Sequence, residues 1–207
     1  MEQVTALQSF NAASVPGVES LPRYCSVGIH PWSAGEMDIE RALQRMRIWA
    51  EHAHCIAFGE AGLDRLRGPD LAHQEVVLIR QLRLAEELRM PMILHNVRCT
   101  SELLRLRLIF NSTPWILHGF QGNAEVAAQC VEKNMHLSFG PGILRNTSRL
   151  AEVLSAVSLE RVFCESDDSG TDVQEVYSAV ECVTGCSESD LRERIWDNFI
   201  HLFGVRP

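Results

Sequence analysis

Four acid or imidazole side chains each follow directly on a short apolar run of this sequence. They are Glu60, His95, His118 and Asp167. Parallel strands that close into a barrel gather their carboxyl ends at one face, so residues far apart in sequence meet there. Two imidazoles with two carboxylates suit Zn²⁺ or Mn²⁺, whereas Mg²⁺ prefers oxygen ligands alone. We therefore expect these residues to hold a divalent metal ion, Zn²⁺, Mn²⁺ or Mg²⁺, with one or two ions per chain.

Two further residues have the chemistry to hold an anionic substrate beside such a metal. His30 follows the apolar run Tyr24–Ile29, and Arg98 lies three residues after His95, on a loop that leads to a helix. The planar guanidinium group of arginine binds phosphate oxygens in pairs. The alternative for His30 is a simple loop residue that Pro31 holds in place. The alternative for Arg98 is an ion pair with a surface carboxylate.

The elements that must position these residues are strands and helices in alternation. Seven apolar runs have the length and composition of buried strands. They are Val4–Phe10, Tyr24–Ile29, Cys55–Gly59, Pro91–Leu94, Pro114–Leu117, Met135–Phe139 and Arg161–Cys164.

Helical patterns lie between these runs. The clearest is Asp70–Arg89, where apolar residues recur at spacings of three and four before Pro91 ends the helix. Similar patterns predict helices over Asp38–Glu51 and Leu191–Phe203, and we expect Asn123 and Ser148 to be helix N-caps.

This alternation predicts an α/β fold with a parallel sheet and right-handed crossovers. Seven strands are one short of a closed eight-stranded barrel, so we expect a distorted TIM-type (β/α) barrel that lacks strand one. The competing fold is a doubly wound sheet, which carries a glycine-rich loop after its first strand. Residues 10–14 contain no glycine, which argues against that fold.

Composition indicates one compact domain over residues 1–207, with 46% hydrophobic residues. No apolar run approaches the ~20 residues that span a bilayer. Residues 1–5 do not resemble a secretory signal, and the seven cysteines contain no C-x-x-C pair, so we expect a cytoplasmic protein. The net charge of −8 argues against a broad basic surface for duplex DNA.

Six short motifs resemble, in order and spacing, those of the TatD-type metal-dependent hydrolases. The resemblance covers nearly the whole chain from Val4 onward, including the closing helix. The motifs are Ser26–Trp32, Ala57–Asp64, Pro91–His95, Leu117–Gly122, Leu137–Gly140 and Glu165–Asp167.

The resemblance implies a deoxyribonuclease on a distorted barrel of the amidohydrolase superfamily, in which a metal-activated water cleaves phosphodiester bonds. We expect its partner to be DNA, single-stranded or at 3′ ends. The roles that it implies are metal ligation by Glu60, His95, His118 and Asp167, catalysis by Asp167 and Glu60, and phosphate binding by His30 and Arg98.

One departure from the family pattern leaves alternatives open. The family opens with a His-x-His strand that supplies two ligands to one metal, and no such segment precedes Val4. A barrel with open strand edges favours self-association or covering by another segment. The alternative functions are a catalytically impaired barrel that acts as a binding or assembly module, and a metal-dependent hydrolase of small amides or lactones.

Overall fold

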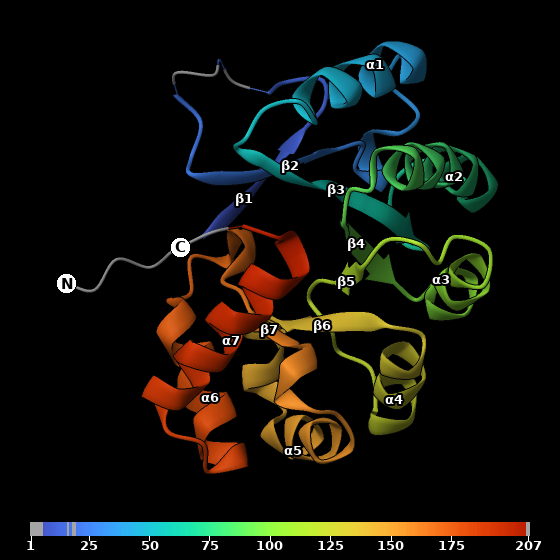
Figure 1. The fold of residues 1–207 in the computed structure, drawn as a ribbon. Helices are drawn as coiled ribbons and strands as arrows, with labels where there is room; N and C mark the ends of the chain where they lie inside the picture. The colour runs from blue at the N-terminus through green and yellow to red at the C-terminus, as the bar shows by residue number, and fades with distance from the viewer. Residues whose placement is uncertain (1–5, 16, 18–19, 206–207) are drawn as a thin grey trace. The chain divides into compact units, whose positions relative to one another are not determined.

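A computed structural model describes residues 6–15, 17 and 20–205 of the chain (Figure 1). The chain divides into two compact units, Met1–Pro114 and Trp115–Pro207. Each unit alternates parallel strands with helices, as the sequence predicts. Within the described residues, no helix combines the length and the apolar character that crossing a membrane requires.

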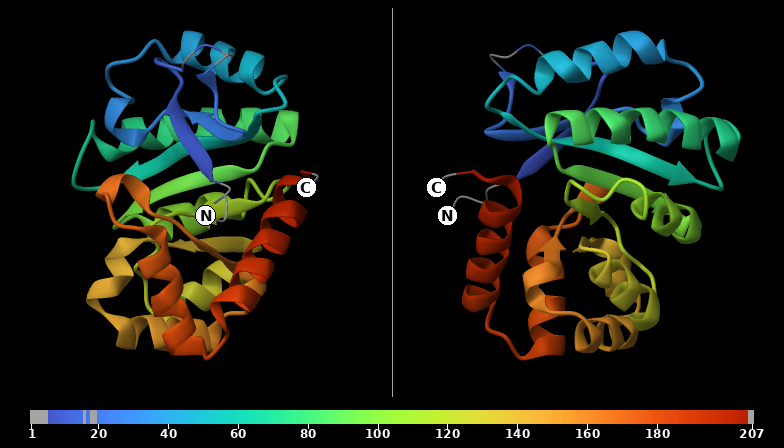
Figure 2. Two further views of the ribbon diagram at one scale, coloured as in Figure 1. Left: turned by 90° about the vertical axis from the view of Figure 1, so that its left-hand side faces the viewer. Right: turned by 45° about the vertical axis from the view of Figure 1, so that its right-hand side comes forward.

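The first unit contains a parallel sheet whose strands follow one another in chain order. Strand β2 is fully buried and β3 nearly so, which is typical of strands covered on both faces. Figure 2 shows α1 and α2 side by side against this sheet. The elements are β1 (Leu7–Asn11), β2 (Tyr24–Gly28), η2 (Pro31–Ser33), α1 (Ile39–Trp49), β3 (Cys55–Asp64), α2 (Leu71–Leu88), β4 (Met92–Val97) and α3 (Thr100–Arg107).

Helix α2 begins and ends where the sequence predicts. The side chain of Asp70 accepts a hydrogen bond from the backbone N–H of His73, and Arg89 ends the helix in the left-handed conformation. Leu78 and Leu82 are each 1% exposed and form its buried face. The same face carries two buried glutamines that bear on the functional site.

The second unit contains three parallel strands and four α-helices within the described residues. Strands β5 and β6 are fully buried. Figure 2 shows α6 and α7 packed as an antiparallel pair. The elements are β5 (Trp115–Leu117), α4 (Ala124–Glu132), β6 (Met135–Phe139), η3 (Pro141–Arg145), α5 (Thr147–Ala156), η4 (Leu159–Arg161), β7 (Val162–Cys164), η5 (Asp167–Ser169), α6 (Val173–Thr184) and α7 (Glu188–Phe203).

All seven strand runs form strands, although Val4 and Thr5 lie outside the described residues. Asn123 caps α4, but the prediction for Ser148 is wrong. Asn146 caps α5 instead, because its side chain accepts the backbone N–H of Arg149 at 3.0 Å. That the whole chain forms a single domain stays a prediction.

Candidate metal centre

Glu60 lies inside strand β3, at an irregularity of its pairing with β4. Phe58 pairs with Met92 and Ala61 with Leu94, so β3 has one residue more than β4 between these pairs. Such bulges re-aim side chains and are common beside active sites. The peptide bond between Gly59 and Glu60 is cis. The sequence pattern ended the strand at Gly59, whereas β3 continues through Glu60 to Asp64.

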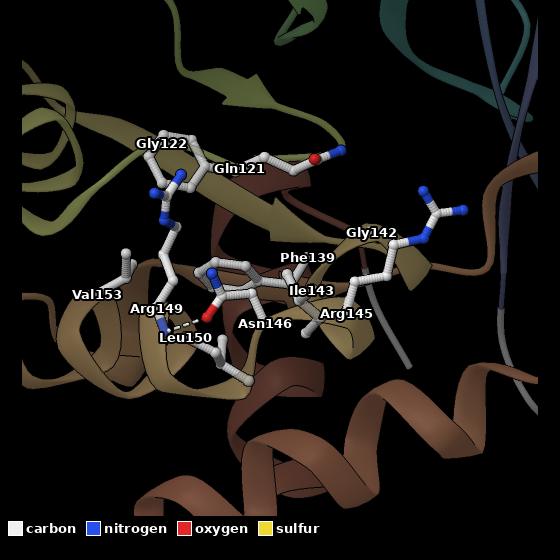
Figure 3. A pocket seen from close by; sticks show the side chains of 11 residues that line it. Gln121, Gly122, Phe139, Gly142, Ile143, Arg145, Asn146, Arg149, Leu150 and Val153 are labelled. Atoms are coloured by element: carbon white, nitrogen blue, oxygen red, sulfur yellow. Dashed lines mark hydrogen bonds between the residues drawn. The ribbon is translucent and has the colours of Figure 1, made fainter.

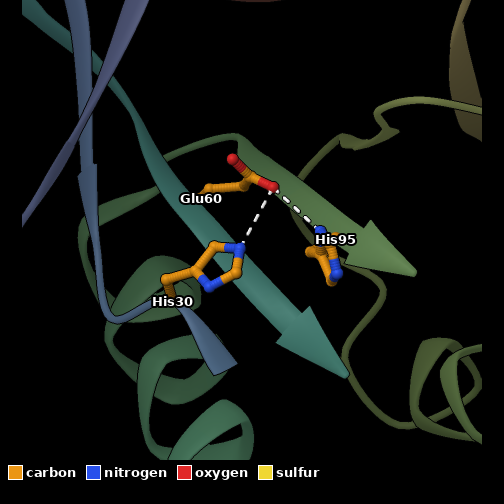
Figure 4. Close-up of side chains that lie close together, drawn as sticks. All are labelled: His30, Glu60 and His95. Carbon is orange, nitrogen blue, oxygen red and sulfur yellow. Dashed lines mark hydrogen bonds and ion pairs between the residues drawn. The ribbon is translucent and has the colours of Figure 1, made fainter. Parts of the chain in front are cut away.

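Glycine at position 62 lets β4 approach closely at His95. Gly62 has φ +142°, and a Cβ atom there would lie 2.1 Å from the carbonyl oxygen of His95. Only glycine adopts this conformation at little cost. Glu60 and His95 therefore face each other across two tightly packed neighbouring strands (Figure 4).

His95 faces a carboxylate with each of its ring nitrogens. Nδ1 lies 3.0 Å from Oε1 of Glu60, and Nε2 lies 3.1 Å from Oδ2 of Asp64. A neutral imidazole carries one N–H, so only one of these two contacts is a hydrogen bond while the ring is neutral. Which nitrogen holds the proton depends on the charge of the two carboxyl groups.

Asp64 is 4% exposed and accepts several hydrogen bonds. Burial acts to raise its pKa, but hydrogen bonds from Trp32 Nε1 (2.6 Å), the Leu66 N–H (2.8 Å) and His95 outweigh it, so the pKa lies below its ordinary value. An ionised Asp64 favours the proton of His95 on Nε2. The lone pair on Nδ1 then faces the carboxylate of Glu60.

Two acceptor atoms at this separation suit a shared cation. Ligand atoms about 2.1 Å from one ion and about 90 to 110° apart lie about 3.0 to 3.4 Å from each other. Oε1 of Glu60 and Nδ1 of His95 are 3.0 Å apart, within that range. An imidazole nitrogen and a carboxylate oxygen are ligands that Zn²⁺ and Mn²⁺ accept. The residues present therefore fit a divalent ion.

His30 completes this cluster, in which all three residues offer a ligand atom within 4.8 Å of one another. Its Nε2 lies 3.4 Å from Oε1 of Glu60, and its Nδ1 accepts the backbone N–H of Trp32 at 3.3 Å. That second bond leaves the proton of neutral His30 on Nε2. An N–H at this position can donate a hydrogen bond to an anion, either the carboxylate of Glu60 or a substrate phosphate.

Arg98 lies at the end of β4 with φ +56° and an exposed side chain. Its carbonyl oxygen accepts a hydrogen bond from Nε of Arg65 at 3.0 Å. In the described part of the chain, its guanidinium group makes no hydrogen bond or ion pair. The phosphate-binding role predicted for Arg98 stays a prediction.

The second unit holds His118 at the end of β5, together with Glu165. Nδ1 of His118 lies 3.3 Å from Oε1 of Glu165, which also accepts the backbone N–H of Gly119 at 2.7 Å. The hydroxyl of Ser138 bonds the other carboxylate oxygen. Glu165 is thus the shared hydrogen-bond acceptor of His118, Gly119 and Ser138. A carboxylate at Nδ1 puts the imidazole lone pair on Nε2, as in many metal-binding histidines.

Asp167 lies in η5 of the second unit and is exposed. Its φ is +51°, and its Oδ1 accepts the backbone N–H of Asp168 at 2.8 Å. Left-handed backbone costs energy for any residue with a Cβ, and it occurs often at functional sites. The ligand and proton-accepting roles predicted for Asp167 stay predictions.

Sequence reasoning missed Asp64 and Trp32, although both lie in quoted motifs. Residues 60, 62 and 64 of a strand point to the same face, a pattern that could have identified Asp64. Trp32 is 39% exposed, and its ring centre lies 5.6 Å from that of His95. The guanidinium carbon of Arg67 lies 3.6 Å from the Trp32 ring centre, which fixes the indole beside the cluster.

Comparison with known families identifies a match over almost the whole chain. A family model described as "TatD related DNase" matches residues 5–204. A metal-dependent hydrolase of Bacillus subtilis, YabD, is 32% identical over 149 residues, which cover 70% of this chain and 58% of that protein. The 3′-5′ ssDNA/RNA exonuclease TatD of Cronobacter turicensis is 30% identical over 154 residues, 70% of this chain and 56% of that protein. The chain thus spans less than two thirds of the length of these relatives.

Solved structures match the fold. The TatD homologue YjjV of Escherichia coli superimposes with a TM-score of 0.79 at 24% identity, over 89% of this chain and 78% of that one. A TatD family hydrolase of Entamoeba histolytica gives a TM-score of 0.75 at 18% identity, over 87% of this chain and 74% of that one. These matches confirm the predicted TIM-type barrel fold, with seven strands rather than eight among the described residues.

Proposed function

The chain belongs to the TatD related DNase family, and from this membership we propose that it is a metal-dependent hydrolase of phosphodiester bonds in single-stranded DNA. The observation that carries the proposal is the pair of Oε1 of Glu60 and Nδ1 of His95, which lie 3.0 Å apart, with His30 beside them in the same cluster. A relative named as a 3′-5′ ssDNA/RNA exonuclease supports the substrate class and cleavage at 3′ ends.

Glu60, His95, His118 and Asp167 are the proposed ligands of one or two divalent ions, Zn²⁺, Mn²⁺ or Mg²⁺. A bound ion of this kind lowers the pKa of a water molecule and polarises a phosphoryl oxygen. Asp64 supports metal binding by His95, because its contact with Nε2 of His95 turns Nδ1 towards Glu60. Glu165 orients His118 in a similar way, because its carboxylate contacts Nδ1 and leaves the lone pair on Nε2. Carboxylates of this kind orient metal-binding histidines and raise their basicity.

The remaining residues act on the substrate and on the attacking water. Asp167 accepts the proton of that water, a step typically worth about 10²–10⁴-fold in rate. His30 donates from Nε2 to a non-bridging phosphate oxygen, since its Nδ1 is occupied by the backbone N–H of Trp32. Arg98 neutralises the charge that develops on the phosphate, and its exposed guanidinium group is available for that contact.

A cytoplasmic location belongs to the same proposal. All seven cysteines are free thiols, four of them buried, as expected in a reducing compartment. Self-association of the chain also stays a proposal, and sedimentation velocity measures it directly.

The test is turnover of end-labelled single-stranded DNA with Mn²⁺, Mg²⁺ or Zn²⁺, for the wild type, Glu60→Gln and the exposed control Glu51→Gln. We expect the wild type to be active and chelator to abolish this activity. Glu60→Gln should be at least about 100-fold less active, and Glu51→Gln should be as active as the wild type. Turnover in Glu60→Gln equal to the wild type contradicts the site. No turnover with any metal favours a binding or assembly module. Turnover only of small amides or lactones favours a metal-dependent hydrolase of those substrates.

A further inference from the structure

Two buried cysteines face each other in the sheet of the first unit, away from the proposed metal centre. Cys25 of β2 and Cys55 of β3 are register partners in a parallel ladder, and these strands lie side by side in Figure 1. The backbone N–H of Cys25 donates to the carbonyl oxygen of His54 at 2.7 Å, which fixes the strands to each other at this point. Register partners on neighbouring strands direct their side chains to the same face of a sheet. The two thiols are therefore neighbours.

The spacing of neighbouring strands suits a disulfide at this position. Neighbouring strands lie about 4.7 to 4.9 Å apart, and the Cα atoms joined by a disulfide are usually about 4.4 to 6.8 Å apart. The register shifts directly after the pair, since Ser26 pairs with Ala57 and Ile56 is an extra residue of β3. A bulge leaves its extra residue without a ladder partner, so the backbone beside Cys55 can adjust when a bond forms.

A hydrogen bond joins the two thiols and separates their acidities. The hydrogen bond from Cys55 lowers the pKa of Cys25 more than burial raises it, whereas the same contact and burial both raise the pKa of Cys55. The first proton of the pair is thus lost from Cys25, and a protonated thiol stays beside the thiolate. A thiolate is the form of cysteine that attacks an oxidant, and a neighbouring cysteine then resolves the product.

We propose that Cys25 and Cys55 form an intramolecular disulfide when the protein meets hydrogen peroxide. The thiolate of Cys25 attacks one oxygen of the peroxide, the O–O bond breaks, and a sulfenic acid and hydroxide result. The hydroxide takes up the proton that Cys25 released. The sulfur of Cys55 then attacks the sulfenic sulfur, the S–O bond breaks, and the departing hydroxide leaves as water with the proton of the Cys55 thiol. Two thiols and one peroxide become one disulfide and two waters.

Burial sets the rate of this reaction and protects its product. Cys25 is 0% exposed and Cys55 is 5% exposed, so peroxide, which is little larger than water, reaches them through local opening of the strands. The exposed thiol of Cys182 therefore reacts faster. Thiol reductants are larger than peroxide, so the disulfide is reduced only slowly while the sheet stays folded.

The disulfide would join two strands that lead to the metal centre. The chain reaches His30 and Glu60 five residues after Cys25 and Cys55 respectively. The closed loop contains His30 and helix α1. A cross-link of this kind restricts the unfolded chain and so stabilises the folded sheet. The bond forms without metal or substrate, so this inference does not depend on the proposed function.

Two features of the second unit lack this pairing of thiols. The pocket of about 220 Å³ has no thiol, imidazole or carboxylate among its lining residues, and its two arginines extend to opposite sides (Figure 3). Cys130 of α4 is as buried as Cys25, at 0% exposure, and burial raises its pKa to about 11. Cys130 is therefore the matched control, because it is equally buried but its pKa is not lowered by a second thiol.

The test treats the reduced wild type with hydrogen peroxide, unfolds it in N-ethylmaleimide and maps its disulfides by mass spectrometry. We expect a pair of peptides linked through Cys25 and Cys55, together with an alkylated Cys130. In Cys25→Ala, Cys55 should stay a free thiol, because its raised pKa keeps it protonated. The oxidised wild type should unfold at a higher urea concentration than the reduced wild type, and peroxide should not shift the urea midpoint of Cys25→Ala.

Free thiols at both positions after peroxide treatment overturn the proposal. A disulfide from Cys25 or Cys55 to any other cysteine overturns it as well, as does a disulfide between Cys182 and Cys186 alone. Equal oxidation of Cys130 without the Cys25–Cys55 bond would show that peroxide attacks buried thiols without regard to their pairing. The map of the wild type decides the question even if a variant fails to fold, and neither result bears on metal-dependent turnover.

Discussion

Gln81 of helix α2 holds the backbone of Ile29 at both of its polar groups. The N–H of Ile29 donates to Oε1 of Gln81 at 2.7 Å, and its carbonyl oxygen accepts from Nε2 at 3.1 Å. Gln74, two turns earlier, makes the same pair of bonds to Asp64, at 2.7 and 2.9 Å. Both glutamines are 1% exposed. One helix face therefore fixes the chain beside His30 and at the end of β3.

Replacing Gln81 by Met should destabilise the protein and displace His30. The change leaves the N–H and carbonyl of Ile29 buried without their partners, at about 1 to 3 kcal/mol each. We expect a loss of about 2 to 4 kcal/mol in the free energy of unfolding, measured by urea titration, and a lower kcat for the protein that remains folded. Gln129→Met, on an exposed face of α4, should change stability by less than about 0.5 kcal/mol. Equal stability of the two variants would refute the role of Gln81.

Replacing Gly62 by Ala should separate β3 from β4 at His95. The new methyl group would lie 2.1 Å from the carbonyl oxygen of His95, and φ +142° is strained for alanine. We expect a loss of at least about 2 kcal/mol in the free energy of unfolding. The control is Gly185→Ala, whose φ is +68° but whose Cβ would meet nothing within 4 Å, and which should cost only about 1 kcal/mol. An equal loss of stability in both variants would show that the positive φ, and not the clash with the carbonyl oxygen of His95, causes the loss.

Thiol reactivity should follow burial. Burial raises the pKa of Cys130 to about 11, so its thiol stays protonated at neutral pH, whereas Cys182 is exposed. We expect a thiol reagent at pH 8 to modify Cys182 first and to reach Cys130 only on unfolding, as read by mass spectrometry of peptides. Cys182→Ser should remove the fast phase. Fast labelling of Cys130 in the native protein would contradict its burial.

The sequence was sufficient to predict the seven strands and their alternation with helices, because both depend on local apolar patterns. It placed the end of β3 at Gly59, since a glycine-flanked glutamate looks like a turn, whereas the pairing with β4 extends β3 to Asp64. The partners of His95 and Ile29 could not be predicted in this way. Asp64 and Gln81 become partners only when strands and helix pack together, and periodicity carries no signal for a buried hydrogen bond.

Replacing Glu165 by Gln should weaken metal binding without unfolding the second unit. The carboxylate of Glu165 accepts bonds from His118, Gly119 and Ser138, and the amide has only one oxygen with which to accept. That oxygen can still accept from His118 and Gly119 while the amide NH2 faces Ser138, but it carries no charge, so the bond at Nδ1 of His118 weakens and the metal-binding nitrogen becomes less basic. We expect metal affinity to fall about 10- to 100-fold by calorimetry. Glu152→Gln, an exposed change on α5, is the control and should bind metal like the wild type.

Divalent metal should stabilise the folded protein, and His95 should be required for this effect. A ligand that binds only the folded state at about 100 times its dissociation constant adds about 2.7 kcal/mol to the free energy of unfolding. We therefore expect Zn²⁺ or Mn²⁺ to raise the Tm of the wild type and chelator to reverse the change. His95→Gln should lose the shift, since Nδ1 of His95 and Oε1 of Glu60 lie 3.0 Å apart. His201→Gln, at an exposed position on α7, should keep it. A full shift in His95→Gln would show that the ion binds elsewhere and would remove Glu60 and His95 from the proposed ligand set.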